Sequence, residues 1–307
     1  MKIAVLEKIE MSEDQKARLE NAGTVQWFDS STPEEINVRI KDADVVVVDW
    51  IDPSPFILNM KSPSLLALLS TGFGWVQHRE EARKRGILIA NVPAYSTEAV
   101  AEHLLGLILC VARRIATGDR AIRSGKCKKG NLRGIELTGR TLGIIGLGNI
   151  GSRLAQQATA LGMRVVSYSR KQKKNKIAPD VSLDKLLNVS DVVAVCCPLN
   201  ADSKMLLNHD RLARMKPGAI LVSATWDVID LAEIAPLLAD GRLFGLGLDA
   251  AVEGSEIKIQ EKLLEFENVV ITPHVAFNTA ESVRRQAAIC IDNIEAFIQK
   301  KPQNIVN

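Results

Sequence analysis

Apolar and polar positions alternate along the first third of the chain in a pattern that predicts strands and helices in turn. Short apolar runs between turn residues predict buried parallel strands, and Asp44–Asp49, with its four consecutive valines, is the clearest. Ser12 with Gln15 forms a capping box, and Pro33 directly follows a second helix cap at Thr32. We therefore expect a small open α/β domain. Its expected strands are Lys2–Leu6, Thr24–Phe28, Asp44–Asp49, Leu65–Ser70 and Ile87–Ala90.

A second and longer α/β pattern fills the rest of the chain. The segment Thr97–Arg114 predicts a helix too apolar to lie on a surface, which we expect to connect two domains, whereas Asp119–Thr138 is basic and irregular. About six apolar runs then alternate with helices, as a doubly wound parallel sheet requires. The expected strands are Leu142–Ile145, Val165–Tyr168, Val192–Cys196, Ala219–Val222, Phe244–Leu248 and Val269–Ile271; the expected helices are Leu183–Leu187, Asn208–Arg214, Leu231–Leu238 and Glu281–Gln299, the last returning to the first domain.

The most specific local pattern is the stretch Thr141–Arg170. Three glycines follow its first strand at G-x-G-x-x-G spacing, namely Gly146, Gly148 and Gly151, and a helix to about Leu161 leads to a second strand. The first glycine allows a tight turn, the second lets the backbone approach a pyrophosphate, and the third lets the helix pack close to the strand. The helix N-terminus offers free N–H groups to the phosphates. This βαβ unit therefore predicts dinucleotide binding.

The end of the second strand favours NADP over NAD. An NAD site usually carries Asp or Glu there, roughly 20 residues on, to hold the ribose 2′-OH. This chain instead has Ser169, followed by the cations Arg170, Lys171, Lys173 and Lys174. A small hydroxyl beside several cations would attract a 2′-phosphate that an acidic residue would repel. A solvated basic loop is the alternative explanation, and NAD binding stays open.

Length and composition exclude several classes of function. The 307 residues suffice for about two domains, and 47% hydrophobic residues suffice for their cores. A net charge of +3 is too small to indicate nucleic-acid binding, and no run reaches the roughly 18 apolar residues of a membrane helix. The five cysteines lack C-x-x-C spacing and no signal-peptide pattern is present, so we expect a cytoplasmic protein with reduced thiols. The four histidines lack metal-ligand spacing, so we expect no metal.

Several stretches together resemble the D-isomer-specific 2-hydroxyacid dehydrogenases. In the family's order they are STGFGWVQ (70–77), RGILIANVPAYSTEAVAEH (85–103), ELTGRTLGIIGLGNIG (136–151), CCPLN (196–200), MKPGAILVSA (215–224), GLGLDAA (245–251) and ITPHVA (271–276). The resemblance implies a Rossmann dinucleotide-binding domain at 100–279 and a smaller flavodoxin-like α/β substrate domain at 1–99 and 280–307. It also implies reduction of a 2-keto acid with a nicotinamide cofactor, and a homodimer formed through the cofactor domain.

The same resemblance implies roles for individual residues. His274, in the motif TPH, corresponds to the family's proton donor, and Asp249 to the residue that bonds the nicotinamide carboxamide. The backbone at Thr71 and Gly72 corresponds to the turn that grips the substrate carboxylate. The other positions expected at the cofactor are Asn149, Ile150, Cys197, Pro198 and Ala224.

Two positions depart from the family pattern. Trp226 stands where the family has the Arg that binds the substrate carboxylate, and no Arg or Lys lies between Lys216 and Arg242. Gly254 stands where the family has the Glu that holds the catalytic His. We expect Glu253 to take that role, with Glu256 as the alternative.

Three functions are compatible with this combination. We predict an NADP(H)-dependent oxidoreductase with altered substrate choice, because an indole in place of a cation suits a larger, less anionic or cationic carbonyl compound. The second function is ordinary 2-hydroxyacid chemistry with a cation recruited from elsewhere, such as Arg79 or Lys128. The third is a catalytically inactive, dinucleotide-sensing binding protein.

Overall fold

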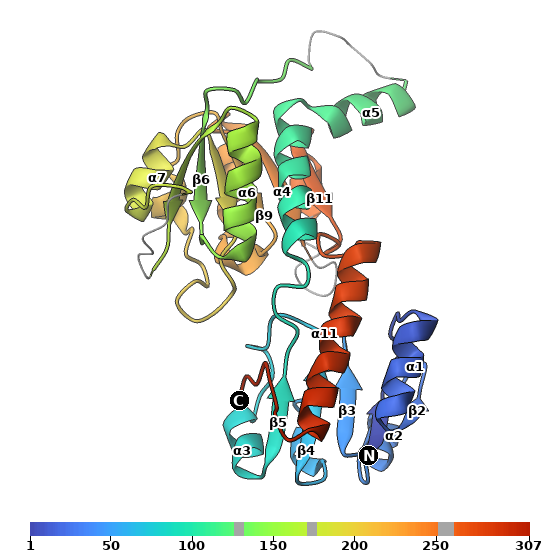
Figure 1. Cartoon of the computed structure of the whole chain (residues 1–307). Coiled ribbons are helices and arrows are strands. Elements are labelled where there is room, and N and C mark those ends of the chain that lie inside the picture. The colour runs from blue at the N-terminus through green and yellow to red at the C-terminus, as the bar shows by residue number, and fades with distance from the viewer. Residues whose placement is uncertain (126–131, 171–176, 251–260) are drawn as a thin grey trace. The chain divides into compact units, whose positions relative to one another are not determined.

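The computed structural model divides the chain into two compact units (Figure 1). Unit 1 comprises Met1–Ser96 and Asn278–Asn307, and unit 2 comprises Thr97–Phe277. The structure describes residues 1–125, 132–170, 177–250 and 261–307, and for Trp226 it describes the backbone alone. The boundaries expected from the sequence, 1–99 with 280–307 and 100–279, lie within three residues of these.

Unit 1 is built on a five-stranded parallel sheet with the order β2-β1-β3-β4-β5. This is the flavodoxin-like order, in which the direction of winding reverses between β1 and β3. The strands are β1 (Lys2–Val5), β2 (Thr24–Trp27), β3 (Val45–Val48), β4 (Ser64–Leu68) and β5 (Ile87–Ala90). The helices are α1 (Glu13–Ala22), α2 (Pro33–Arg39), the 3-10 turn η1 (Ile57–Asn59), α3 (Arg79–Lys84) and α11 (Ala280–Ile298).

Both predicted helix starts in unit 1 are confirmed. The Ser12 hydroxyl accepts from the backbone N–H of Gln15, whose side chain accepts from the backbone N–H of Ser12, so the capping box is complete. Thr32 caps α2 in the same way. Helix α3 was not predicted, because among its six residues only Ala82 is buried and no apolar periodicity marks it.

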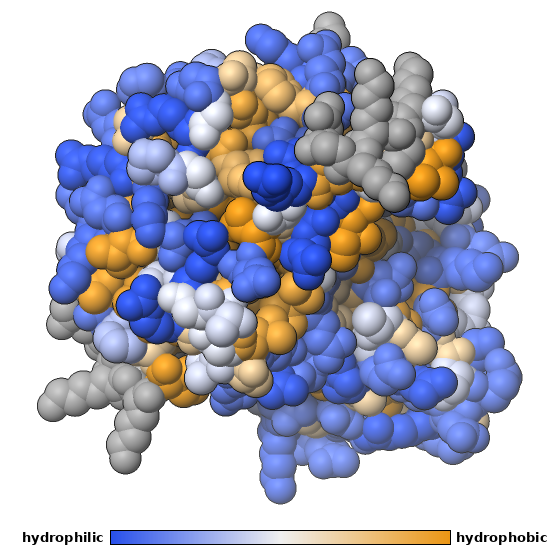
Figure 2. Space-filling view, turned by 90° about the horizontal axis from the view of Figure 1, so that it is seen from above, coloured by the Kyte–Doolittle hydropathy of each residue, from blue (hydrophilic) through white to orange (hydrophobic). Residues whose placement is uncertain are grey.

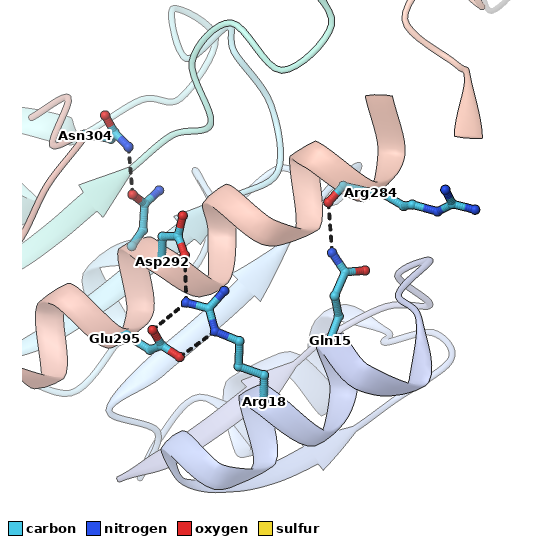
Figure 3. A network of polar contacts seen from close by, with 7 residues as sticks. Gln15, Arg18, Arg284, Asp292, Glu295 and Asn304 are labelled. Atoms are coloured by element: carbon cyan, nitrogen blue, oxygen red, sulfur yellow. Dashed lines mark hydrogen bonds and ion pairs between the residues drawn. The ribbon is translucent and has the colours of Figure 1, made fainter. Parts of the chain in front are cut away.

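The last helix, α11, belongs to unit 1, as expected. Figure 3 shows Arg18 of α1 reaching two carboxylates of α11, Asp292 at 2.7 Å and Glu295 at 2.5 Å. Gln15 of α1 also donates to the carbonyl oxygen of Arg284 at 2.8 Å. Segments from the two ends of the chain are thereby joined in one unit.

Unit 2 is built on a six-stranded parallel sheet with the order β11-β10-β9-β8-β6-β7. A single bridge between Ser167 and Asp180 lies beyond β7, where a dinucleotide-binding fold has a further strand. The strands are β6 (Thr141–Ile145), β7 (Arg164–Tyr168), β8 (Val192–Val195), β9 (Ala219–Ser223), β10 (Leu243–Asp249) and β11 (Val269–Thr272). The helices are α4 (Thr97–Ala112), α5 (Ile115–Arg123), α6 (Asn149–Ala160), α7 (Leu183–Val189), α8 (His209–Leu212) and α9 (Ile234–Ala239), with the 3-10 turns η3 (Trp226–Val228) and η4 (Leu231–Glu233).

Helices cover both faces of this sheet, so it is doubly wound as predicted. Ile144, Ala194 and Val222 pack with residues of α4 and α6 in one core. Ile145, Val195 and Leu221 point the other way and pack with residues of α7, α8 and α9 in a second core. Because strands buried on both faces are apolar throughout, their sequence shows runs rather than alternation.

Two predictions for unit 2 were wrong in detail. The segment Asp119–Thr138 is not irregular throughout, because α5 includes its first five residues; α5 buries only Thr117, and its isoleucines Ile115 and Ile122 are exposed, so no buried apolar face marked it. The segment Leu231–Leu238 is not one helix but η4 followed by α9. Pro236 lacks an N–H group and is tolerated in the first turn of a helix, which is where α9 has it.

Within the described ranges, no helix is long and apolar enough to cross a membrane. The same ranges contain no cluster of three His, Cys, Asp or Glu side chains that could hold a metal ion. The four cysteines that the structure describes are free thiols, and Cys290 is buried.

Candidate active site

Close backbone contacts shape the glycine turn after β6. Gly146 has a φ of +98°, and a Cβ there would lie 2.6 Å from the backbone nitrogen of Cys197. A Cβ on Gly151 would lie 2.3 Å from the carbonyl oxygen of Gly146, so only glycine lets α6 pack this close to the strand. At Gly148, by contrast, no described protein atom lies within 4 Å of the Cβ position. The space left open there, at the N-cap of α6, fits the approach of a pyrophosphate to the backbone.

A pocket of about 310 Å³ lies beside this turn, at the carboxyl ends of β6, β7 and β8. The winding of the sheet reverses at this place, and open α/β sheets bind their ligands at such a switch point. Six of the residues predicted to bind the cofactor line the pocket, namely Gly146, Gly148, Ser169, Arg170, Cys197 and Pro198. Two others, Asn149 and Ile150, form the first turn of α6, and Ala224 directly follows β9.

The end of β7 carries the residues that bear on cofactor choice. The Ser169 hydroxyl accepts from the backbone N–H of Leu147 at 3.1 Å, which ties the strand end to the glycine turn. Arg170 forms an ion pair with Asp202, and both side chains line the pocket. The other predicted cations, Lys171, Lys173 and Lys174, lie outside the described residues. No motif in the sequence predicted Asp202 at this site.

Asp202 is carried on a turn that is held by its own hydrogen bonds. Asn200 Oδ1 accepts from the backbone N–H groups of Asp202 at 3.0 Å and Ser203 at 3.2 Å. The Ser203 hydroxyl donates to the carbonyl oxygen of Pro198 at 2.7 Å. The braced turn keeps the Asp202 carboxylate at the pocket, where it competes for Arg170 with any anion that binds there.

His274 lies in the turn directly after β11. Its backbone is left-handed, with a φ of 53°, and its ring centroid lies 5.7 Å from that of Phe277. Because all strands of the sheet are parallel, this turn shares one edge with the glycine turn and with the segment after β9. The predicted proton donor and the predicted cofactor turn are therefore on the same edge of unit 2.

Asp249, the last residue of β10, holds the turn that carries His274. Its side chain is 2% exposed. Oδ1 accepts from the Thr272 hydroxyl at 2.6 Å and from the Val275 N–H at 2.9 Å, and Oδ2 accepts from the Ala276 N–H at 2.8 Å. The carboxylate thus bonds to residues on both sides of His274. The contact with the nicotinamide carboxamide stays a prediction.

His103, on α4, belongs to the same network and was not among the residues predicted for the site. Its Nε2 lies 2.9 Å from Thr272 Oγ1 and 3.8 Å from Asp249 Oδ1. A signal was present, because His103 interrupts the buried stripe of α4 formed by Val100, Leu104 and Leu107. A polar ring in such a stripe is usually hydrogen-bonded.

The glycines of β10 bring α4 close enough for this contact. A Cβ on Gly245 would lie 2.6 Å from Val111 Cγ1, and a Cβ on Gly247 would lie 3.0 Å from Leu107 Cβ. Any larger residue at Gly245 would push the helix away from the sheet. The motif GLGLD therefore places the helix as well as Asp249.

The predicted substrate turn, Thr71 and Gly72, lies after β4 in unit 1. Asn91 donates to the carbonyl oxygen of Thr71 at 2.7 Å, while Ser70 (2.7 Å) and Trp75 (3.2 Å) donate to that of Gly72. Because these carbonyl oxygens are engaged, the groups that this exposed turn offers to an anion are its backbone N–H groups.

An acidic pair that the sequence analysis did not consider lies at the carboxyl edge of the unit 1 sheet. Glu7 Oε1 accepts from the backbone N–H groups of Asp49 (2.8 Å), Trp50 (3.1 Å) and Ile51 (3.0 Å). Burial, with a contribution from the charge of Glu7, raises the pKa of Asp49 to about 7. Trp50 and Trp75 are both exposed, on the loops after neighbouring strands.

The remaining predicted residues are placed only in part. The backbone of Trp226 begins η3 after β9, and that segment is fixed by the bond from the Met205 N–H to the carbonyl oxygen of Asp227 at 2.8 Å. Arg79 is engaged in its own loop, where it donates to the carbonyl oxygen of Phe73 at 3.0 Å. Glu253, Gly254, Glu256 and Lys128 lie outside the described residues, so their roles stay predictions.

Known proteins resemble this chain over nearly its full length. Residues 105–276 match the family model described as D-isomer specific 2-hydroxyacid dehydrogenase, NAD binding domain. The chain is 34% identical over 295 residues to a glyoxylate reductase of Korarchaeum cryptofilum, covering 92% of this chain and 88% of that protein. It is 36% identical over 265 residues to a hydroxypyruvate reductase of Thermotoga maritima, covering 85% and 84%. The structure of an acyclic imino acid reductase in complex with NADPH and D-Arg is similar over 100% of both chains, with a TM-score of 0.91 and 27% identity.

Proposed function

The chain belongs to the D-isomer-specific 2-hydroxyacid dehydrogenase family, and from this premise we propose that it is an NADPH-dependent reductase with His274 as proton donor and an altered substrate choice. Membership makes the protein an oxidoreductase acting on CH–OH groups, with an NAD-binding domain in residues 105–276. The observation that carries the proposal is the His274 turn, which Asp249 holds by hydrogen bonds on both sides of the histidine.

The reaction follows from the groups at the carboxyl edge of unit 2. A bound nicotinamide dinucleotide supplies the hydride for the substrate carbon. His274 gives a proton to the substrate oxygen as the C=O bond becomes CH–OH, so the charge balances. Asp249 keeps His274 in place and is our candidate for bonding the carboxamide. The glycine turn and the first turn of α6 are our candidates for holding the pyrophosphate.

We infer from the end of β7 that NADPH is preferred over NADH. Ser169 carries no charge to repel a 2′-phosphate, and Arg170 lines the same pocket. The imino acid reductase with a similar structure was solved with NADPH. Asp202 opposes this preference, because a phosphate must take Arg170 from it.

The cofactor proposal is tested by fluorescence titration with NADPH and NADH. We expect NADPH to bind several-fold more tightly than NADH. Arg170→Ala should weaken NADPH binding about tenfold, and Asp202→Asn should strengthen it. Neither substitution should change the affinity for NADH. Lys204→Ala is the matched control, because this cation lies on the same turn as Asp202 but does not line the pocket. Equal affinities of the wild type for the two nucleotides would contradict the proposal.

Trp226, which replaces the family's Arg, bears on the choice of substrate. No cation lies in the segment after β9, so a small 2-keto acid lacks its usual carboxylate partner, and losing such a group typically lowers turnover about 10²–10³-fold. The indole of Trp226, which stands in place of that Arg in the sequence, offers a flat apolar face and a cation–π partner. We propose a 2-keto acid that is larger than glyoxylate or carries a cationic side chain.

A second candidate is the corresponding 2-imino acid, favoured by one observation. The imino acid reductase with a TM-score of 0.91 was solved with NADPH and D-Arg, a cationic amino acid. Both candidates use the same hydride and differ in the atom that receives the proton from His274, oxygen in one case and nitrogen in the other.

Both are tested by following the nicotinamide absorbance of NADPH with a panel of keto acids, with and without ammonium to form the imine. The panel contains glyoxylate, hydroxypyruvate, pyruvate and the keto acids derived from arginine and lysine. We expect the cationic compounds to be reduced faster than glyoxylate, and Trp226→Arg to raise glyoxylate reduction at least tenfold. Glyoxylate as the best substrate would support ordinary family chemistry. Tight NADPH binding without turnover of any compound would support the sensing function.

A further inference from the structure

We propose that His103 is a positioning residue for the proton donor: through Thr272, it completes the hydrogen-bond set by which Asp249 holds the His274 turn. The inference rests on the proposed function in one respect, the role of His274 as proton donor. The bonds that join His103, Thr272 and Asp249 all lie within unit 2, between the side chains of α4, β11 and β10.

The direction of each bond follows from the atoms involved. Thr272 has one hydroxyl proton, and its Oγ1 lies 2.6 Å from Asp249 Oδ1, which already accepts from the Val275 N–H. A carboxylate oxygen only accepts, so the hydroxyl proton points to Asp249. The hydroxyl oxygen must then accept from His103 at 2.9 Å, which assigns the hydrogen to Nε2 of that ring.

Backbone strain explains why the turn needs so many donors. His274 has a φ of 53°, and a residue other than glycine is held in that region only when its surroundings restrain it. Asp249 restrains the turn through Thr272 before the histidine and through Val275 and Ala276 after it. The bond to Thr272 depends on the rotation of a hydroxyl group, and His103 is what orients that hydroxyl.

Without a donor at position 103, the Thr272 hydroxyl can turn away from Asp249. The carboxylate then keeps its two backbone bonds on one side of His274 and loses the bond on the other side. We expect the His274 ring to sample orientations in which it does not reach the substrate atom, which lowers kcat and leaves nucleotide binding at the glycine turn unchanged.

The test compares two substitutions at one position. His103→Leu removes the donor, and we expect kcat to fall about tenfold while KM for NADPH stays within about twofold. His103→Gln supplies an amide N–H at a similar reach, and we expect kcat within about threefold of the wild type. Glu102→Gln, on the exposed face of the same helix, is the control and should change neither constant.

Thr272→Val tests whether the two side chains act together. It should lower kcat as much as His103→Leu does, and the double variant should lower it no further, because both changes remove the same bond to Asp249. Additive losses would show that His103 acts on something other than Thr272, and would overturn the proposal.

A readout without turnover separates this inference from the proposed function. In the NMR spectrum of the NADPH complex, the His274 ring C–H signal should shift and broaden in His103→Leu, but not in His103→Gln or Glu102→Gln. A wild type that reduces no compound would refute the proposed function while this comparison still applies. An unchanged His274 signal in His103→Leu, or equal changes in the Leu and Gln variants, would refute the role of His103.

Discussion

At the scale of single residues, two buried carboxylates have opposite effects on the fold. Asp249 accepts three hydrogen bonds and stabilises the turn around His274. Asp49 is also largely buried, but its side-chain contact with Gln286 is long, at 3.5 Å, and the charge of Glu7 is close by. Ionised Asp49 therefore destabilises unit 1.

The raised pKa of Asp49 predicts how the stability of the folded protein depends on pH. Its pKa is raised from 3.8 to about 7 in the folded protein, so between those values the folded state binds more protons than the unfolded state. The stability contributed by this group therefore falls as pH rises through that window and is lost above it. We expect Asp49→Asn to melt several degrees above the wild type at pH 8 and at nearly the same temperature at pH 4.

Calorimetry or circular dichroism across that pH range measures the difference. Asp42→Asn, at an exposed carboxylate of the same unit, is the control and should melt at the same temperature as the wild type at both pH values. A difference between Asp49→Asn and the wild type that grows toward low pH would have the opposite sign and would contradict the assignment.

At the scale of elements, the packing of α4 on β10 places the hydrogen-bond network around His274. The helix is buried along one side, and the glycines of β10 let it lie against the strand. This close packing lets His103 Nε2 lie 2.9 Å from Thr272 Oγ1 on β11. The packing of α4 on β10 thus determines both the stability of these two elements and the geometry of the turn that carries His274.

Two glycine substitutions should move stability in opposite directions. At Gly245 a Cβ would lie 2.5 Å from the carbonyl oxygen of Asn268, so Gly245→Ala forces the backbone to shift and should destabilise unit 2 by about 1–3 kcal/mol, or roughly 2–12 °C. At Gly106, an exposed position inside α4 with no described atom within 4 Å of the Cβ position, Gly106→Ala should stabilise by about 0.5–1 kcal/mol. Thermal melting of both variants gives the comparison. A Gly245→Ala protein as stable as the wild type would show that α4 is not held as tightly as we argue.

At the scale of the whole molecule, the short helix α5 carries two exposed isoleucines. Ile115 is 58% exposed and Ile122 is 66% exposed. Figure 1 shows α5 extending away from the end of α4. Figure 2 shows hydrophobic residues scattered among hydrophilic ones on the face of the molecule seen from above. Exposed apolar residues on one element often mark an interface. We propose that a second copy of the chain covers α5, in keeping with the homodimer through the cofactor domain that the sequence predicts.

Light scattering tests this assembly. We expect a mass of twice the 33.5 kDa chain, and Ile122→Glu should return it to the mass of one chain because a buried charge without a partner disfavours association. Val38→Glu, at a 76% exposed apolar residue of unit 1, is the control and should leave the mass unchanged. A wild type that scatters as a single chain would refute the dimer.

Local signals explain why most elements could be predicted. The capping boxes at Ser12 and Thr32 and the apolar runs of β3 and β6 act over a few residues, so they are visible in the sequence. Helices α3 and α5 were missed because each buries a single side chain, and η4 was merged with α9 because a proline in a first turn looks like part of one helix. An element that buries few side chains shows little apolar periodicity in its sequence, so it is hard to predict.

The glycine turn, the two α/β units and the family could be predicted from the sequence, because each is encoded by residues within short stretches. The roles of His274 and Asp249 stay predictions. The bonds that Asp249 makes around His274, the pairing of Arg170 with Asp202 and the contact of His103 with Thr272 depend on tertiary packing. His103 and Thr272 are 169 residues apart in the chain and join at 2.9 Å. A hydrogen bond depends on distances of a few tenths of an ångström, and here those distances result from how closely a helix packs on a strand.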